Sequence, residues 1–250
     1  MYMRDKIMDI LVKLSSFWFF YRWHPEVAIR YLPIVDEIKR LNNDSIILEV
    51  GSGGLGIAPY IKRKIIGVDV GFKPPFYPLL KSVKASATKL PFGDNSFDGV
   101  VSVDMLEHLK KKDREKAIFE MVRIARKKIL IGVPAGKEAF DQDKELDEYY
   151  FKRYEKRFVF LEEQLNFGLP EKEEINDIIK RAGITYQRKL NIKIIGNENL
   201  TLRRFLMKGW MTKNILLDLF FRKAMLLTVP FIRYMNQEPT YRQIYIIDIL

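Results

Sequence analysis

Residues 45–56, Ser-Ile-Ile-Leu-Glu-Val-Gly-Ser-Gly-Gly-Leu-Gly, decide the fold of this chain. Residues 45–50 are a short apolar run that ends at glycines, which is the pattern of a buried strand. The glycines let the main chain turn tightly and let a ligand approach the backbone. A helix after this turn would offer free N–H groups to a carboxylate or a phosphate. The segment therefore predicts a ligand-binding loop at the end of a buried strand.

Further apolar runs follow at intervals that leave room for helices between them. We expect strands at 64–70, 81–85, 97–103 and 128–133, and a helix at 113–125. Strands that alternate with helices indicate a doubly wound α/β fold, with a mostly parallel sheet covered on both faces. Residues 184–195 and 241–250 read as two more strands, separated by a long excursion. This arrangement predicts a seven-stranded sheet with an antiparallel C-terminal edge pair.

Segments at both ends of the chain and one before residue 184 are expected to be helical. Residues 5–41 fit two helices, the second of which begins at Pro25, because proline suits the first turn of a helix. A helix over 170–182 would be closed by Gly183. We therefore expect a Rossmann-like core that carries two helical additions. The expected parts are an N-terminal helical lid at 1–44, a core at 45–199 and 240–250, and a helical basic cap at 200–239.

Length and composition restrict the class of protein. The chain has 250 residues, which is enough for one sizeable core and fits one domain with an insertion better than two domains. It contains no cysteine, which excludes disulfides, thiolate metal sites and a cysteine nucleophile. The N-terminus lacks the pattern of a signal peptide, and no run reaches the ~18 uncharged residues of a membrane span. We expect a cytoplasmic protein.

The positive charge of the chain is concentrated in the expected cap. The net charge is +11, and residues 200–235 contribute seven basic side chains and one acidic side chain to it. Such a surface could contact an anionic membrane or a phosphate. The alternative, which we favour for most of these residues, is a cap whose apolar face packs on the sheet while its charges are solvated. No RNA-binding module is recognisable, so we expect no nucleic acid partner. The oligomeric state is left open.

The glycine loop fits two cofactor classes. Gly51, Gly53 and Gly56 spell the Gly-x-Gly-x-x-Gly fingerprint of dinucleotide sites, and Asp69 follows at the distance of a ribose-binding acid. NAD(P) and S-adenosylmethionine both contain an adenosine ribose, so Asp69 fits either one. Glu49, two residues before the first glycine, would repel a pyrophosphate but would favour the cationic end of a methionine moiety. Alternatively, Glu49 accepts only backbone hydrogen bonds from the loop.

A longer block resembles a known family. Residues 85–109 contain Leu-Pro-Phe at 90–92, Ser-Phe-Asp at 96–98 and Leu-Glu-His-Leu at 106–109. Together with residues 49–56 and Gly-Val-Asp at 67–69, this block resembles the class I S-adenosylmethionine-dependent methyltransferases of the type 11 group. The resemblance extends over roughly residues 45–135. It implies S-adenosylmethionine as the cofactor and a sheet that ends in an antiparallel hairpin, and it disfavours an NAD(P)-dependent oxidoreductase.

The resemblance also implies where the cofactor lies. The loop at Gly51, Ser52 and Gly53 would pass the methionine part, Glu49 would lie beside it, and Asp69 would hold the ribose hydroxyls. The other implied positions are Val70 beside the ribose-binding acid, Ser86 and Ala87 at the adenine, and Asp104 and Met105 on the methionine side. Two departures concern single contacts. Leu55 stands where the family usually has its third glycine, and Ser86 replaces a common aspartate.

The signal for catalytic residues is weaker. Methyl transfer to an alcohol or amine needs positioning and a base, and His108 lies near the carboxyl end of the fourth strand. A packing role for His108 remains an alternative. Asp104, Glu107 and His108 would share one helical face, as in some metal-binding relatives, but a further histidine ligand is hard to find, so we expect no metal. The expected acceptor is a small molecule, a sugar or a lipid- or glycan-linked intermediate. A cofactor-binding protein without transferase activity is the second hypothesis.

Overall fold

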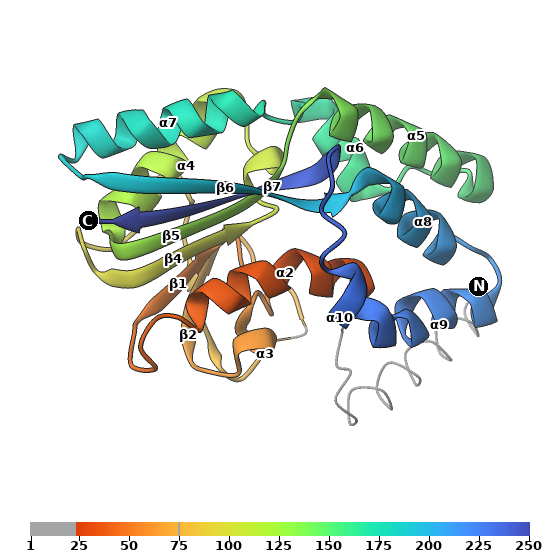
Figure 1. Ribbon diagram of the computed structural model, residues 1–250, viewed down its shortest axis with the longest axis horizontal. Coiled ribbons are helices and arrows are strands. Elements are labelled where there is room, and N and C mark those ends of the chain that lie inside the picture. Colours follow the sequence, from red (N-terminus) through yellow and green to blue (C-terminus); the bar gives the residue numbers. More distant parts are fainter. Residues whose placement is uncertain (1–23, 75) are drawn as a thin grey trace.

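The computed structural model describes residues 24–74 and 76–250, which form a seven-stranded sheet between two layers of helices (Figure 1). The strand order is β3-β2-β1-β4-β5-β7-β6. The strands are β1 (Ile47–Val50), β2 (Ile65–Asp69), β3 (Leu80–Lys84), β4 (Phe97–Val103), β5 (Ala125–Pro134), β6 (Leu190–Asn199) and β7 (Thr240–Ile249). The expected doubly wound sheet is confirmed.

The pairing of the strands shows where a ligand would bind. Strands β1 to β5 pair in parallel, with Leu48 opposite Ile66 of β2 on one side and opposite Val100 of β4 on the other. The strand order therefore reverses beside β1, and the crevice at the carboxyl ends of β1 and β4 is the usual ligand site of such sheets. Strand β7 runs antiparallel between β5 and β6, as the expected C-terminal pair requires.

Each face of the sheet has its own apolar core. Helices α4 (Lys111–Ile124) and α7 (Lys172–Thr185) cover one face, and α2 (Pro25–Ile38) and α3 (Ala58–Ile61) cover the other (Figure 1). All residues of β1 and β4 are buried, since both strands are enclosed by helices on both sides. Burial of the apolar side chains of these strands, at ~25 cal/mol per Å² of apolar surface, is the main stabilising contribution to the core.

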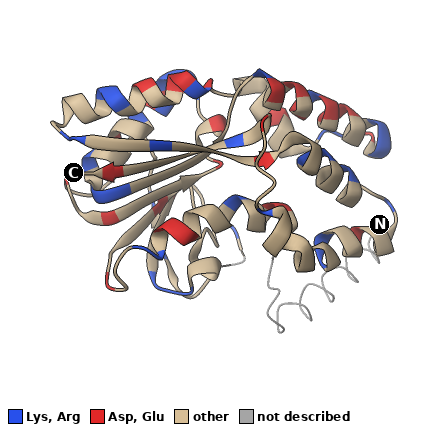
Figure 2. Ribbon diagram, in the orientation of Figure 1, with Lys and Arg blue, Asp and Glu red and all other residues tan. Residues whose placement is uncertain are grey.

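Two helical groups lie over the carboxyl ends of the strands. One group follows β5 and consists of α5 (Lys137–Tyr154) and α6 (Val159–Phe167). The other lies between β6 and β7 and consists of α8 (Leu200–Trp210), α9 (Ile215–Arg222), the 3-10 turn η2 (Ala224–Thr228) and α10 (Val229–Ile232). Figure 2 shows acidic side chains along α5 and basic ones on α8. Glu145 of α5 pairs with Arg204 and Lys208 of α8, so part of the basic charge of the cap is neutralised within the protein.

Several expected boundaries change. The strand expected at 184–195 begins only at Leu190, because helix α7 continues to Thr185 and a turn follows. The helix after the glycine loop is a single turn, Ala58–Ile61. The charged segment 137–168 forms two helices that the sequence pattern did not predict. The start of α2 at Pro25 is confirmed, whereas the helix expected before it lies outside the described residues. Among the residues described, no helix is both long and apolar enough to span a membrane.

Candidate cofactor and acceptor site

The glycine loop after β1 has a shape that only glycine permits at two positions. Gly51 has φ +82° and Gly56 has φ +50°, a region that favours glycine. A Cβ at Gly51 would overlap with the side chain of Met105, and a Cβ at Gly56 would overlap with the carboxylate of Glu49. At Gly53, by contrast, a Cβ would meet no atom within 4 Å. Open space therefore runs along the backbone at the centre of the loop.

Glu49 is a fully buried acid beneath this loop. Its Oε2 accepts a hydrogen bond from the backbone N–H of Ile57 at 2.7 Å, as the alternative interpretation of this residue expected. Its Oε1 has no hydrogen-bond partner within 24–74 and 76–250. Burial raises the pKa of Glu49 to about 7, since the Ile57 N–H, the Tyr31 hydroxyl and the charge of Arg30 only partly offset the desolvation of the charge. A cationic group beside Oε1 would offset more of this desolvation.

Asp69 ends β2 on the open side of the loop. Its Oδ2 accepts from the N–H of Gly53 at 2.9 Å and its Oδ1 accepts from the N–H of Gly71 at 3.1 Å. The adjacent Val70 is 68% exposed, although it is apolar. Ser86 hydrogen-bonds with Thr88 at 2.8 Å, so its hydroxyl is used within its own turn. Ala87 lies half-buried in the same turn. The loop, Asp69 and this turn thus lie at neighbouring strand ends.

Asp104, directly after β4, has a different environment from the one expected. Its carboxylate binds Arg242 through two hydrogen bonds of 2.6 and 2.8 Å and binds Arg30 through a third of 2.8 Å. These two guanidinium groups outweigh burial and lower the pKa of Asp104 to about 2. With φ +47°, Asp104 is not helical, and only the 3-10 turn η1 (Leu106–His108) follows it. The shared helical face of Asp104, Glu107 and His108 is therefore wrong.

A cavity of about 950 Å³ opens beside Asp104. Its walls come from α2, η1, α6, α8, α9 and the ends of β6 and β7, so the cap and the lid side of the molecule enclose it together. Leu55 of the glycine loop reaches one end of the cavity and Trp210 of α8 reaches another. The cavity is large enough for a small-molecule acceptor. Its position joins the carboxyl ends of β1 and β4 to the cap.

His108 and Glu107 lie at the η1 wall of this cavity. The His108 side chain is 26% exposed, and its Nδ1 lies 3.0 Å from Oε2 of Glu163 on α6. Glu107 is fully buried, and neither of its carboxyl oxygens has a hydrogen-bond partner among the described residues. Burial, together with the neighbouring charge of Asp104, raises the pKa of Glu107 well above its usual range. A histidine with an acid partner thus faces the cavity, as a general base would require.

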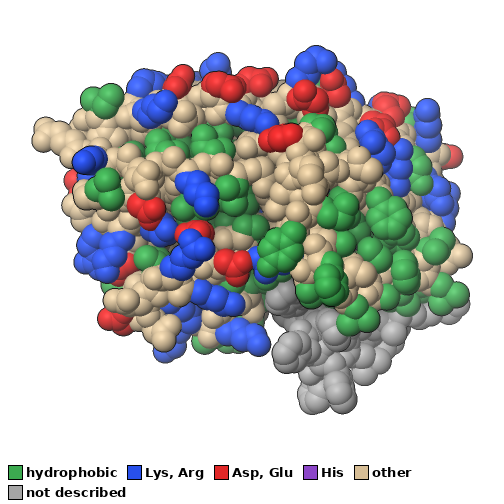
Figure 3. Space-filling view, in the orientation of Figure 1, with side chains coloured by type: hydrophobic (Ala, Val, Ile, Leu, Met, Phe, Trp, Pro, Cys, Tyr) green, Lys and Arg blue, Asp and Glu red, His purple; other side chains and the backbone are tan. Residues whose placement is uncertain are grey.

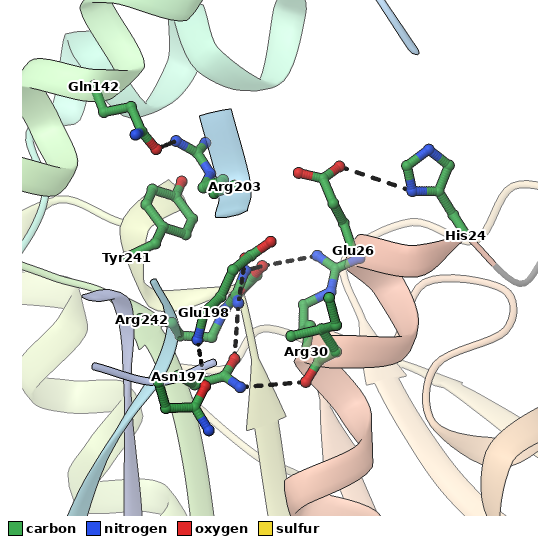
Figure 4. Close-up of polar contacts among 12 residues, drawn as sticks. His24, Glu26, Arg30, Gln142, Asn197, Glu198, Arg203, Tyr241 and Arg242 are labelled. Atoms are coloured by element: carbon green, nitrogen blue, oxygen red, sulfur yellow. Dashed lines mark hydrogen bonds and ion pairs between the residues drawn. The ribbon is translucent and has the colours of Figure 1, made fainter. Parts of the chain in front are cut away.

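Two acids that sequence reasoning missed face the cavity from opposite sides (Figure 4). Glu26 comes from the first turn of α2, and Glu198 comes from the end of β6. Glu26 accepts a hydrogen bond from Nε1 of Trp210 at 3.2 Å. Glu198 has φ +64°, and its Oε2 accepts from Arg242 at 3.3 Å. No local motif marks either residue, and only the fold brings them together.

A comparison with protein families identifies the central part of the chain. Residues 48–131 match the family model described as methyltransferase domain. This match includes the glycine loop, Asp69 and the 85–109 block.

Residues 48–131 are a methyltransferase domain.

Solved structures agree with this domain at the level of the fold. An S-adenosylmethionine-dependent methyltransferase from Thermotoga maritima is 20% identical, with a TM-score of 0.50 over 98% of each chain. Phosphoethanolamine N-methyltransferase 2 from Haemonchus contortus, solved with phosphomonomethylethanolamine and S-adenosylhomocysteine, is 17% identical with a TM-score of 0.53. That match covers 94% of this chain and 56% of the other. No curated protein sequence matches this chain.

The methyltransferase domain brings together most of the predicted cofactor residues, and it offers no metal cluster in its described part. Glu49, Gly51, Ser52, Gly53, Asp69, Val70 and Met105 surround the carboxyl ends of β1, β2 and β4. Their contacts with a cofactor stay predictions. No group of three or more His, Asp or Glu side chains suited to a metal occurs in 24–74 and 76–250.

The raised pKa of Glu49 predicts a pH-dependent stability of the domain. A buried acid whose folded pKa lies above its unfolded pKa stabilises the fold at low pH, and this contribution is lost as the pH rises through about 7. We expect Glu49→Gln to raise the free energy of unfolding by about 2 kcal/mol relative to wild type at pH 8 and by much less at pH 5. Urea titrations at both pH values, with the exposed Glu173→Gln as control, measure the difference. Parallel pH profiles of wild type and Glu49→Gln would contradict this account.

Proposed function

We propose that this chain is an S-adenosylmethionine-dependent methyltransferase that methylates an oxygen or nitrogen atom of an acceptor bound in the 950 Å³ cavity. The observation that carries the proposal is the continuity of two sites. The open glycine loop and Asp69 lie at the strand ends, and the cavity begins beside the same loop at Leu55. A cofactor on the loop and an acceptor in the cavity would therefore meet near Asp104 and Met105.

The residues of the loop fit S-adenosylmethionine. The open space at Gly53 admits a ligand against the backbone, and the unpartnered Oε1 of Glu49 suits a cationic amino group. The Asp69 carboxylate has lone pairs left for ribose hydroxyls, and the exposed Val70 offers an apolar surface beside them. When bound, the cofactor supplies an activated methyl group on a sulfonium. The protein supplies position, exclusion of water and a proton acceptor.

The acid–histidine pair at η1 is our candidate for the proton acceptor. His108 faces the cavity, Oε2 of Glu163 lies 3.0 Å from its Nδ1, and Oε1 of Glu107 lies 4.0 Å from its Nε2. An acceptor hydroxyl or ammonium that loses its proton to the ring would carry the lone pair that attacks carbon. The transfer then needs no metal ion.

Replacing His108 tests this role. We expect His108→Asn to lower kcat by about 10²–10⁴-fold while the affinity for S-adenosylmethionine stays within about twofold. Label transfer from methyl-tritiated S-adenosylmethionine to acceptor pools measures kcat, and calorimetry measures the affinity. The exposed Lys112→Asn on α4 serves as the control. An unchanged kcat would assign His108 a packing role, and label that never leaves the cofactor in wild type would favour a binding protein without transferase activity.

The cap supports a further element of the proposal, an acceptor presented at an anionic membrane. Apolar side chains gather on the face of the cap formed by α9 and the segment after it (Figure 3). Leu216, Leu227 and Phe231 are 74%, 74% and 78% exposed. The exposed Lys213 precedes them in the sequence, so a basic group accompanies the apolar ones, as in surfaces that bind lipid headgroups, whereas Arg233 is paired with Asp36. A lipid-linked acceptor could then enter the cavity from the cap.

Vesicle binding tests this membrane contact. We expect the full chain to cosediment with phosphatidylglycerol vesicles and not with phosphatidylcholine vesicles. Leu216→Ser combined with Phe231→Ser should weaken the binding at least about tenfold, because both side chains lose apolar contact area. Ile184→Ser, which changes an equally exposed apolar residue on α7, should bind like wild type. Binding that is unaffected by the double change would refute the contact. The cytoplasmic location and the division into lid, core and cap remain predictions.

A further inference from the structure

Charged side chains surround the cavity. Arg30, Arg203 and Arg242 pair with Asp104, Asp143 and Glu198. Arg222 and Lys223 also line the cavity, and Arg222 pairs with Asp218. Among the described residues, Glu26 and Oε1 of Glu198 have no arginine partner. Burying a carboxylate oxygen without a donor is costly, so such groups at the wall of a cavity indicate a place where a bound cation completes the site.

The arginines are already committed to other partners. Arg203 binds Asp143 at 2.7 Å and Gln142 at 2.9 Å, and its guanidinium lies 3.4 Å from the centre of the Tyr241 ring. Arg242 and Arg30 both bind Asp104. Figure 4 shows Arg203 beside Gln142 and Tyr241, and Arg242 beside Asn197 and Glu198. The three arginines therefore already have partners in the cavity wall, whereas Glu26 and Glu198 face the open space.

Glu26 and Glu198 are the acids that remain open to the cavity. Glu198 is only 1% exposed, its Oε1 has no hydrogen-bond partner among the described residues, and its side chain lies at the cavity wall opposite Glu26 (Figure 4). The side chain of Glu26 is 19% exposed at the same space. Burial, and next the charge of Glu198, raises the pKa of Glu26 to about 7. A positive group between them would relieve both effects.

The other titratable groups at this space are His24, Arg222 and Lys223. Burial and the nearby Arg222 lower the pKa of His24 to about 3, so His24 is neutral. Arg222 of α9 pairs with Asp218 at 2.7 Å and lies over the ring of Trp210. Burial lowers the pKa of Lys223, which lies at the α9 edge of the cavity. Trp210 and Phe158 add aromatic surface to the lining.

We propose that Glu26 and Glu198 bind a cationic amino group of the methyl acceptor, which makes the acceptor an amine-bearing molecule. This inference rests on the proposed function, because it places the acceptor in the same cavity. The two carboxylates lie on separate elements, α2 and β6, and would hold the ammonium from two sides with charge-assisted hydrogen bonds. A divalent metal is the less suitable occupant, since no cluster of three metal-binding side chains exists among the described residues.

Binding of a simple amine, measured without S-adenosylmethionine, tests this inference. The probes are 2-phenylethylamine and its neutral counterpart 2-phenylethanol, titrated into the full chain at pH 7.5 by ligand-observed NMR. We expect the amine to bind at least about tenfold more tightly than the alcohol. Glu26→Gln and Glu198→Gln should each weaken the amine about tenfold or more and leave the alcohol unchanged, since each loses a hydrogen bond to a charged group. Glu173→Gln, an exposed acid on α7, should bind like wild type.

A stability measurement separates lost binding from lost folding. Because the pKa of Glu26 is raised, its ionised form destabilises the fold, and Glu26→Gln should melt no lower than wild type at pH 8. Lost amine binding in a variant that is at least as stable as wild type would therefore support the site. Equal binding of the two probes, no amine binding by wild type, or wild-type affinity in both Gln variants would overturn it. Because the titration contains no cofactor, its result can be interpreted even if the protein transfers no methyl group.

Discussion

Asp104→Asn is expected to destabilise the protein by about 3–5 kcal/mol, the largest effect of any single change considered. The substitution removes the only carboxylate that contacts both Arg30 and Arg242 in the described chain, and Arg242 is nearly fully buried. Breaking a buried ion pair leaves an uncompensated charge, and here it leaves two guanidinium groups short of a partner. Asparagine tolerates the left-handed backbone at φ +47°, so the loss of stability will come from the removed charge and not from backbone strain. Urea unfolding at pH 7 measures the free energy of unfolding.

An exposed pair provides the control for this result. Asp141 pairs with Lys137 one helical turn away, and about half of its side chain is exposed. Asp141→Asn should leave the free energy of unfolding nearly unchanged, because water screens such a pair. If Asp104→Asn proved as stable as Asp141→Asn, the Arg30–Asp104–Arg242 cluster could not be what holds α2 against the end of β7.

Asp69→Ala is expected to weaken S-adenosylmethionine binding about 100-fold. The substitution removes the carboxylate proposed to hold the ribose hydroxyls, and hydrogen bonds to a charged group contribute ~1.5–3 kcal/mol. It also releases the N–H of Gly53, which loosens the loop where the methionine part would pass. Calorimetric titration of the variant measures the dissociation constant.

The control for Asp69→Ala is Asp177→Ala on the exposed side of α7, which should bind the cofactor like wild type. If Asp69→Ala bound the cofactor with wild-type affinity, the role of Asp69 would be limited to its hydrogen bond with the N–H of Gly53 in the loop. In that case the ribose would have to be held by other groups at the strand ends.

The sequence was sufficient for the sheet and for the loop, because both depend on local patterns. The largely apolar run 97–103 has the length and the valine content of a buried strand, and glycines at 51 and 56 are needed where the chain passes Met105 and Glu49. The ends of elements were harder to predict. The strand at 184–195 was started too early, because helix α7 does not end at Gly183 but continues to Thr185.

The cavity could not be predicted, since it depends on contacts between distant segments. Asp104 sits beside His108 in the sequence but turns toward Arg242, which is 138 residues away. Glu26 and Glu198 carry no motif, and they face one space only because α2 and the end of β6 converge there. A sequence pattern cannot show which distant residues meet in the fold, whereas the cavity between Glu26 and Glu198 can be seen as soon as the fold is known.

The central claim is that the glycine loop binds S-adenosylmethionine. Isothermal titration calorimetry of the full chain with S-adenosylmethionine, S-adenosylhomocysteine and NADH tests this claim most directly. Our account predicts micromolar binding of the first two and no binding of NADH. Binding of NADH alone would contradict it, and would make Gly51, Gly53 and Gly56 a dinucleotide site.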